Sequence, residues 1–249
     1  MSKQRGTPSK RQTIREKRRQ EQRRQRMTMI LVIAGVAIAL AALLIAPSVI
    51  NALTPVGDIV QITPQDRPMV DGLAMGDPNA PVKIDVYEDF QCPSCRAYTE
   101  STEPRVVENY VATGKVYYVF HNYPFLDDRV PGQESDQAAN AAMCAADQGR
   151  FWDYHDILFA NWNGENQGSF SDKRLVAFAE SLGLDMSQFN TCFESNAHQA
   201  EIQADLASGQ TVGVQGTPSV FINGQLITPG KIPSYQDVAN AVEAMLADQ

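Results

Sequence analysis

Two cysteines three positions apart are the residues in this chain with the clearest capacity for chemistry. Cys92 and Cys95 lie in the stretch EDFQCPSCRAY, residues 88–98, with Pro93 and Ser94 between them. A pair with this spacing is compatible with a metal clamp, a structural disulfide or a reactive dithiol. The residues around the pair must decide among the three.

The metal and structural interpretations are both weak. A zinc site needs two further ligands at suitable spacing. The chain has no second Cys-x-x-Cys, and its three histidines, His121, His155 and His198, are scattered singly. A disulfide that closes so short a loop gains little entropy. We therefore expect no metal and no cofactor, and we favour redox chemistry.

The local geometry expected around the pair makes its two thiols unequal. The run PVKIDVYEDF predicts a strand that ends near Phe90, and the residues after the cysteines predict a helix. Pro93 suits the first helical turn, so Cys92 falls at the helix N-terminus, where free N–H groups favour a thiolate. We predict Cys92 as the attacking thiol and Cys95, one turn further in, as the resolving thiol.

A second motif, GVQGTPSVFING, covers residues 213–224. Thr217-Pro218 directly precedes a predicted strand, where proline is tolerated only at the first position. We interpret Pro218 as a cis-proline opposite Cys92. It would leave the Thr217 backbone free to pair with an extended substrate peptide and keep metal-ligating groups away from the thiolate.

The chain divides into four predicted parts. Residues 1–26 form a basic tail with a balance of +9, and residues 27–46 form an uncharged apolar run long enough for a transmembrane helix. Residues 47–75, rich in Pro, Gly and Asp, predict a linker, and residues 76–249 the main domain. Because basic flanks stay cytoplasmic, we expect the N-terminus inside and the acidic domain, with all four cysteines, on the extracytoplasmic side of the cell membrane.

Two alternatives for the N-terminal region are less favoured. A cleaved signal peptide has a shorter apolar core and a small-x-small cleavage site, and SVINAL after Pro47 is a poor one. The basic tail could bind nucleic acid, but it has no interleaved aromatic residues for stacking on bases, and its position beside an apolar span already accounts for it. We expect a single-pass signal-anchor and no nucleic-acid partner.

The order of elements in residues 76–249 predicts an α/β domain. Helical periodicity occupies about residues 134–209, and removing this block leaves a β-α-β-β-β-α core. SVFING and QLITPG predict a hairpin that turns through Asn223-Gly224. Ser234 and Asp237 resemble a capping box for the last helix.

These motifs together resemble the DsbA-like branch of the thioredoxin superfamily. DVYEDFQCPSCRAY, AAMCAADQGRFWDYHDILFAN, FNTCFES and GVQGTPSVFING match that family in order, over about residues 76–247. The resemblance implies a thioredoxin fold with a helical insertion, Cys92 as nucleophile, Cys95 as resolving thiol and Pro218 in cis. Relatives often carry a proton-handling carboxylate six residues before the first cysteine, where this chain has Val86. Asp85, Glu88 and Asp89 lie nearby at other offsets, and of these Glu88 is a candidate for the role.

The other two cysteines, Cys144 and Cys192, both fall in the helical block. They could be buried free thiols, or a relay to the active pair, or a structural disulfide. Two free thiols in an exported domain are liable to oxidise, some relatives carry a pair in these places, and a bridge closing 49 residues would stabilise by roughly 4 kcal/mol. We favour the structural disulfide.

The resulting functional hypothesis is a membrane-tethered oxidoreductase that introduces disulfides into exported proteins. Recycling would need a membrane-embedded redox partner, DsbB-like or vitamin-K-epoxide-reductase-like, as the family implies. The alternatives are a disulfide reductase or isomerase that uses the same residues, and a non-catalytic tethered peptide-binding or chaperone module.

Overall fold

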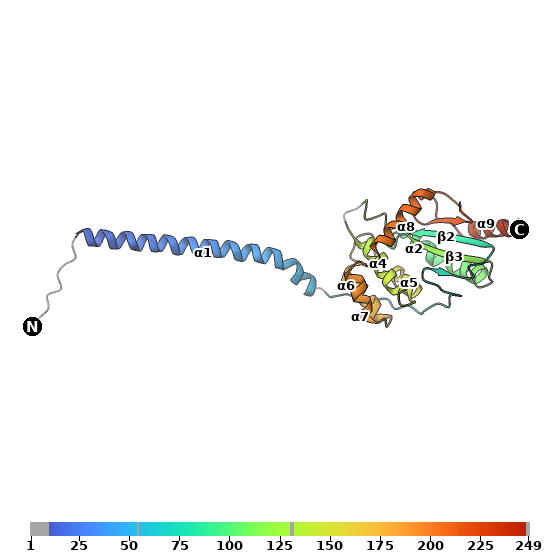
Figure 1. Cartoon of the computed structure of the whole chain (residues 1–249), viewed down its shortest axis with the longest axis horizontal. Helices are drawn as coiled ribbons and strands as arrows, with labels where there is room; N and C mark the ends of the chain where they lie inside the picture. The colour runs from blue at the N-terminus through green and yellow to red at the C-terminus, as the bar shows by residue number, and fades with distance from the viewer. Residues whose placement is uncertain (1–9, 54, 130–131, 248–249) are drawn as a thin grey trace, which may run out of the picture. The chain divides into compact units, whose positions relative to one another are not determined.

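The computed structural model describes residues 10–53, 55–129 and 132–247 and separates into two compact units, Met1–Pro55 and Val56–Gln249. The first unit contains one long helix, α1 (Lys10–Leu53), which continues past Pro47 (Figure 1). Its segment Arg18–Ala46 is long and apolar enough to cross a membrane. This segment contains the apolar run predicted at residues 27–46.

A five-stranded mixed sheet forms the centre of the second unit. Its strands are β1 (Ala74–Met75), β2 (Val82–Glu88), β3 (Val116–Asn122), β4 (Ser219–Ile222) and β5 (Gln225–Leu226), in the order β1-β3-β2-β4-β5. β2 is central, parallel to β3 and antiparallel to β4. With its helices this sheet is a thioredoxin fold, as predicted.

The alternation of side chains along β2 separates two cores. Val82, Ile84 and Val86 are fully buried on the face that joins the main hydrophobic core. Tyr87 points to the opposite face, where it packs in a smaller cluster that includes Leu206 of helix α8 (Gln199–Val212). Glu88 follows the parity of Val86 and therefore lies on the main-core side at the carboxyl end of β2.

The helices of the second unit fall into two groups. Those of the thioredoxin core are α2 (Pro93–Ser101), α3 (Glu103–Val106), the π-helical turn η1 (Val107–Val111) and α9 (Tyr235–Ala247). The inserted group, of which α4 to α7 gather beside the sheet in Figure 1, comprises α4 (Glu134–Ala146), α5 (Phe151–Ala160), α6 (Asp172–Ser181), α7 (Met186–Glu194) and α8 (Gln199–Val212). The helix expected after the cysteines is interrupted just before Pro104, because proline is accommodated in the first turn of a new helix.

Two local predictions at the C-terminal end are confirmed. β4 and β5 pair through Asn223 and Gly224, both of which have positive φ, as a two-residue hairpin turn requires. Ser234 and Asp237 cap α9 reciprocally: the Ser234 N–H donates to the Asp237 carboxylate at 2.9 Å, and the Asp237 N–H donates to the Ser234 hydroxyl at 3.3 Å.

The prediction of a linker over residues 47–75 is wrong for its C-terminal part. Residues from Val56 onward belong to the second unit, and residues 74–75 form its edge strand β1. The Val60 N–H donates to Asn161 at 2.8 Å, and the Arg67 side chain is buried. The prediction failed because this segment has no periodicity of its own and is held by contacts with residues about 100 positions away.

Candidate functional site

Cys92 and Cys95 lie where the sequence analysis expects them, between the end of β2 and the start of α2. Cys92 is the N-cap of α2 with extended backbone angles, and Pro93 opens the helix. Both thiols are free. Cys92 is 6% exposed and Cys95 is fully buried, so Cys92 is the sulfur that a substrate can reach.

The two thiols differ strongly in acidity. A hydrogen bond from Cys95, followed by contributions from Thr217 and the N–H groups of Cys95 and Ser94, lowers the pKa of Cys92 to about 6 against the opposing effect of burial. Burial raises the pKa of Cys95 well above its usual range, and the hydrogen bond with Cys92 and the nearby Glu88 raise it further. At neutral pH the reduced pair therefore holds one thiolate, on Cys92.

This asymmetry predicts the pH profile of the reduced protein. Cys92 should ionise as the pH rises through about 6, whereas an unperturbed thiol ionises near 8.5. Because its folded pKa is depressed, the stabilisation that the thiolate gives to the reduced form is complete above about pH 8.5 and is lost as the pH falls through about 6. Ultraviolet thiolate absorbance of the reduced chain should show this step, and Cys92→Ser should remove it. A single step near pH 8.5 would contradict the prediction.

The loop before β4 lies against the pair. The Thr217-Pro218 peptide bond is cis, and the Cys92 thiol donates to the Thr217 carbonyl oxygen at 3.4 Å. A cavity of about 490 Å³ next to them is lined by Ser94, Thr217, Pro218 and Lys231, among others. The structure thus brings both sequence motifs to one place, with a groove beside them.

Asp89 and Gln91 shape the loop that carries Cys92, and sequence reasoning gave them no role. The buried Asp89 carboxylate accepts hydrogen bonds from the Gln91 N–H at 2.8 Å, the Ser135 hydroxyl at 2.7 Å and the Leu126 N–H at 3.1 Å. Burial raises its pKa to about 7. The Gln91 amide group donates to Ser135 at 2.9 Å. Single acidic and amide residues in a loop offered no signal for these contacts.

Glu88 is a buried carboxyl group without a partner. It is 1% exposed, and neither carboxyl oxygen has a hydrogen-bond partner in the structure. Burial raises its pKa well above the usual range, with further raising by Glu103 and Cys92. Val86, at the position where relatives often carry the carboxylate, is fully buried on the same side of β2. Glu88 is therefore a buried carboxyl group with a raised pKa, one pleat nearer to Cys92 than Val86.

A buried ionic cluster joins residue 67 to the insertion. The Arg67 guanidinium donates to both carboxylate oxygens of Asp156 at 2.8 and 2.9 Å and to Glu103 at 3.0 Å. His155, which is completely buried, lies 3.0 Å from Asp156 through Nδ1. The guanidinium also lies over the Trp152 ring, 5.0 Å from its centroid. This cluster fixes the segment before β1 to α3 and α5.

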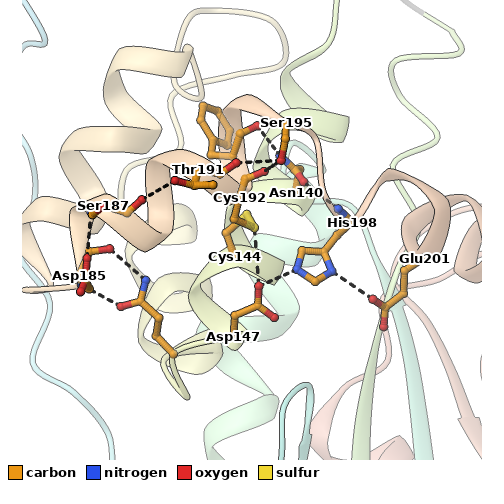
Figure 2. The surroundings of a disulfide bond; sticks show 12 residues. Asn140, Cys144, Asp147, Asp185, Ser187, Thr191, Cys192, Ser195, His198 and Glu201 are labelled. Atoms are coloured by element: carbon orange, nitrogen blue, oxygen red, sulfur yellow. Dashed lines mark hydrogen bonds and ion pairs between the residues drawn. A yellow bond between two sulfur atoms is a disulfide. The ribbon is translucent and has the colours of Figure 1, made fainter.

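Cys144 of α4 and Cys192 of α7 are joined by a disulfide, with Cα atoms 5.8 Å apart. The bridge connects two helices of the insertion. None of the interactions described for this part of the chain links it to the Cys92–Cys95 pair. Figure 2 shows its surroundings, in which Asp147 and His198 lie beside the sulfur of Cys192.

A thioredoxin sheet with a Cys-x-x-Cys pair at a helix N-terminus and a facing cis-proline defines a dithiol domain of the thioredoxin class. The thioredoxin family model matches residues 69–244. A probable disulfide bond formation protein D from Bacillus anthracis is 31% identical over 160 residues, which cover 63% of this chain and 71% of that protein. The Na(+)/H(+) antiporter NhaA 3 of Salinispora tropica is 35% identical over 150 residues, but these cover only 21% of that protein.

Solved structures show the same fold. Oxidised BdbD from Bacillus subtilis superposes with a TM-score of 0.63 at 21% identity, covering 77% of this chain and all of that one. The α-DsbA1 protein of Wolbachia pipientis gives a TM-score of 0.60 at 21% identity, covering 73% and 94% of the two chains. The chain belongs to the thioredoxin family, as a DsbA-like thiol-disulfide oxidoreductase.

Proposed function

We propose that this oxidoreductase is an extracytoplasmic oxidant, tethered to the cell membrane by α1, that introduces disulfides into exported proteins through Cys92 and Cys95. The observation that carries the proposal is the unequal acidity of the two thiols. A Cys92 thiolate with a pKa of about 6 stabilises the reduced form and so makes the disulfide form a stronger oxidant. The names of the Bacillus relatives, disulfide bond formation protein D, agree with this direction.

The proposed reaction proceeds through one mixed disulfide. A substrate thiolate attacks the Cys92 sulfur of the Cys92–Cys95 disulfide, and Cys95 leaves with the electron pair of the broken bond. A second substrate thiolate then attacks the substrate sulfur of the mixed disulfide, so that a substrate disulfide forms and Cys92 leaves as a stabilised thiolate. Two electrons pass from the substrate dithiol to the Cys92–Cys95 pair.

The groove beside the pair suits an extended substrate peptide. Thr217 lies on the loop that faces Cys92, and its carbonyl oxygen lies 3.4 Å from the Cys92 sulfur. Neither a Cys92 thiolate nor a Cys92–Cys95 disulfide can donate to that carbonyl, so it is available to a substrate N–H. Ser94 and Pro218 line the same groove, which supports their assignment as substrate-contacting residues.

Glu88 is our candidate donor of the proton that Cys95 takes up when it leaves. A fully buried thiolate is costly, and Glu88 is a buried carboxyl group whose raised pKa favours the protonated form. Glu88→Gln should slow oxidation of a substrate dithiol at neutral pH by about 100-fold, the lower end of the usual contribution of general acid catalysis. Stopped-flow tryptophan fluorescence would measure this. Asp85→Asn is the control, because Asp85 lies on the opposite face of β2, paired with Lys83 at 2.7 Å. Equal rates in both variants would remove Glu88 from the mechanism.

Tethering by α1 would hold the active site near a recycling partner in the same membrane. With the basic tail in the cytoplasm, α1 would leave the second unit on the extracytoplasmic side, where disulfides persist. The reduced pair must pass its electrons on, and a membrane-embedded oxidase, DsbB-like or vitamin-K-epoxide-reductase-like, is the partner we propose.

A redox titration against glutathione tests the direction of electron flow. We expect a potential near the oxidising end of the thioredoxin superfamily, about −120 mV, rather than the reducing end near about −270 mV. A value at the reducing end would support a reductase. Efficient reshuffling of a scrambled substrate, with little net oxidation, would support an isomerase. Peptide binding unaffected by loss of both thiols, with no turnover, would support a chaperone module.

A further inference from the structure

The Cys144–Cys192 disulfide has a set of polar neighbours that a purely structural bridge does not need. The Asp147 carboxylate lies 3.6 Å from the Cys192 sulfur and 2.9 Å from Nε2 of His198 (Figure 2). The two sulfurs and a ring nitrogen of His198 all lie within 4.8 Å of one another. Two sulfurs and an imidazole nitrogen thus meet at the junction of α4, α7 and α8, with a carboxylate oxygen of Asp147 beside Cys192 and His198.

His198 is oriented as a metal-binding histidine would be. Its Nδ1 faces the Glu201 carboxylate at 3.1 Å, which leaves Nε2 pointing toward Asp147 and the disulfide (Figure 2). Histidine ligands of zinc usually donate their second N–H to a carboxylate in this way, because the bond fixes the ring and raises its basicity. Glu201 therefore provides the outer support, and Nε2 is the ring atom directed toward Asp147 and the sulfurs.

We propose that, once the disulfide is reduced, its two thiolates join His198 and Asp147 as the four ligands of a zinc ion. Zinc binds thiolate sulfur at about 2.3 Å and imidazole nitrogen or carboxylate oxygen at about 2.0–2.2 Å in tetrahedral sites. In such a site the ligand atoms are roughly 3.3–3.8 Å apart. The donors here need only modest side-chain movement to reach those separations, since all come from helix ends already in contact.

The electrons for this conversion come from an external dithiol, the class of compound on which a thiol-disulfide oxidoreductase acts. The dithiol closes into its own disulfide, the Cys144–Cys192 bond breaks, and two thiols form on this chain. Zinc then displaces the two thiol protons, and the cation takes the place of any proton shared between His198 and Asp147. The site therefore forms only in the reduced protein and is lost on reoxidation.

A reductant can approach this bridge from the surface. Cys192 is 9% exposed and lines a surface depression together with Gln188, Thr191 and Ser195, whereas Cys144 is fully buried. The Cys192 sulfur is therefore the one open to attack. The side chains of Asp147 and His198 remain 42% and 17% exposed, so a cation can enter from the same direction.

A second cluster of possible metal ligands among the described residues is not suited to binding zinc. Glu103, His155 and Asp156 also lie close together, but the Arg67 guanidinium already pairs with both carboxylates at 2.8 to 3.0 Å. A cation there would have to displace a buried guanidinium. The proposal is therefore specific to the disulfide in the insertion.

The test is metal binding by the full-length chain in detergent, with Cys92→Ser and Cys95→Ser to remove the other thiols. After reduction with a phosphine and removal of the reductant, Co²⁺ should bind in equimolar amount and give the thiolate charge-transfer and visible bands of four-coordinate cobalt. Zn²⁺ should displace it and abolish the bands. The oxidised chain should show none. Reduced protein without these bands would overturn the proposal.

Three further variants assign the ligands in this background. Cys144→Ser and His198→Gln should lose or strongly weaken the cobalt bands. Glu201→Gln, a change at an exposed carboxylate that leaves both sulfurs in place, should fold and should weaken binding by about 10- to 100-fold. His121→Gln is the control, because His121 is also held between carboxylates, Asp85 and Asp205, but is not grouped with a cysteine. Equal cobalt affinity in Glu201→Gln and His121→Gln would refute the site even if the ligand variants fail to fold.

Discussion

Replacing Cys95 by alanine will cause Cys92 to accumulate in mixed disulfides with exported proteins. The accessible Cys92 thiolate attacks a disulfide of an exported protein, so that one substrate sulfur leaves and the other stays bound to Cys92. Loss of the Cys95 hydrogen bond raises the pKa of Cys92, but the contributions of Thr217 and the Ser94 N–H remain. Without Cys95, nothing within the chain's site can release the bound substrate sulfur. Non-reducing electrophoresis of membranes from cells that express the variant would show higher-mass species that collapse on reduction.

Two companion variants make this result specific. Cys92→Ser and the double variant Cys92→Ser/Cys95→Ala should form no mixed disulfides through this site, and Cys92→Ser should oxidise substrate dithiols no faster than the uncatalysed reaction. Cys144→Ser in the Cys95→Ala background should still trap substrates, because that cysteine belongs to a separate bridge in the insertion. Absence of trapped species in Cys95→Ala, with the protein folded and exported, would refute the role assigned to Cys92.

Replacing Arg67 by alanine will lower the free energy of unfolding of the second unit by about 3–5 kcal/mol, the range for breaking a buried ion pair by removing one partner. Arg67 is 4% exposed in its side chain, and its partners Glu103 and Asp156 are 1% and 8% exposed. Its removal leaves two buried carboxylates without their cation and opens a gap over Trp152. Denaturant unfolding followed by tryptophan fluorescence is a suitable measurement, because both tryptophans of the chain, Trp152 and Trp162, lie in this unit.

The matched control is an arginine in an exposed pair. Arg96 lies 2.7 Å from Glu100 on the surface of α2, with side chains 34% and 56% exposed, and Arg96→Ala should change the unfolding free energy by no more than about 1 kcal/mol. If Arg67→Ala behaves like Arg96→Ala, the cluster contributes little. Loss of stability in Arg67→Ala also predicts that a domain cut at residue 76 is less stable than one that begins at Val56.

The reactive pair and the Arg67 cluster differ in how far apart in the sequence their partners lie. The reactive pair was recognisable because a strand, a helix start and Pro93 lie within a few residues of Cys92, and the backbone angles of that junction follow from those residues alone. The Asn223-Gly224 hairpin and the Ser234–Asp237 cap were predictable for the same reason. The role of Arg67 was not predictable, because its partners are 36 and 89 positions away and the segment around it has no hydrophobic periodicity.

The sequence alone thus determined the redox motif, the apolar helix, the helical insertion and the order of the main strands along the chain. These features depend on periodicity, length and the conformational limits of proline and glycine, all of which act over a few residues. Only the tertiary structure decided that Glu88 is buried without a partner, that Asp89 and Gln91 hold the reactive loop, and that Asp147 and His198 meet the disulfide. Each of these depends on long-range packing, which decides which polar groups lose water and which charges they then face.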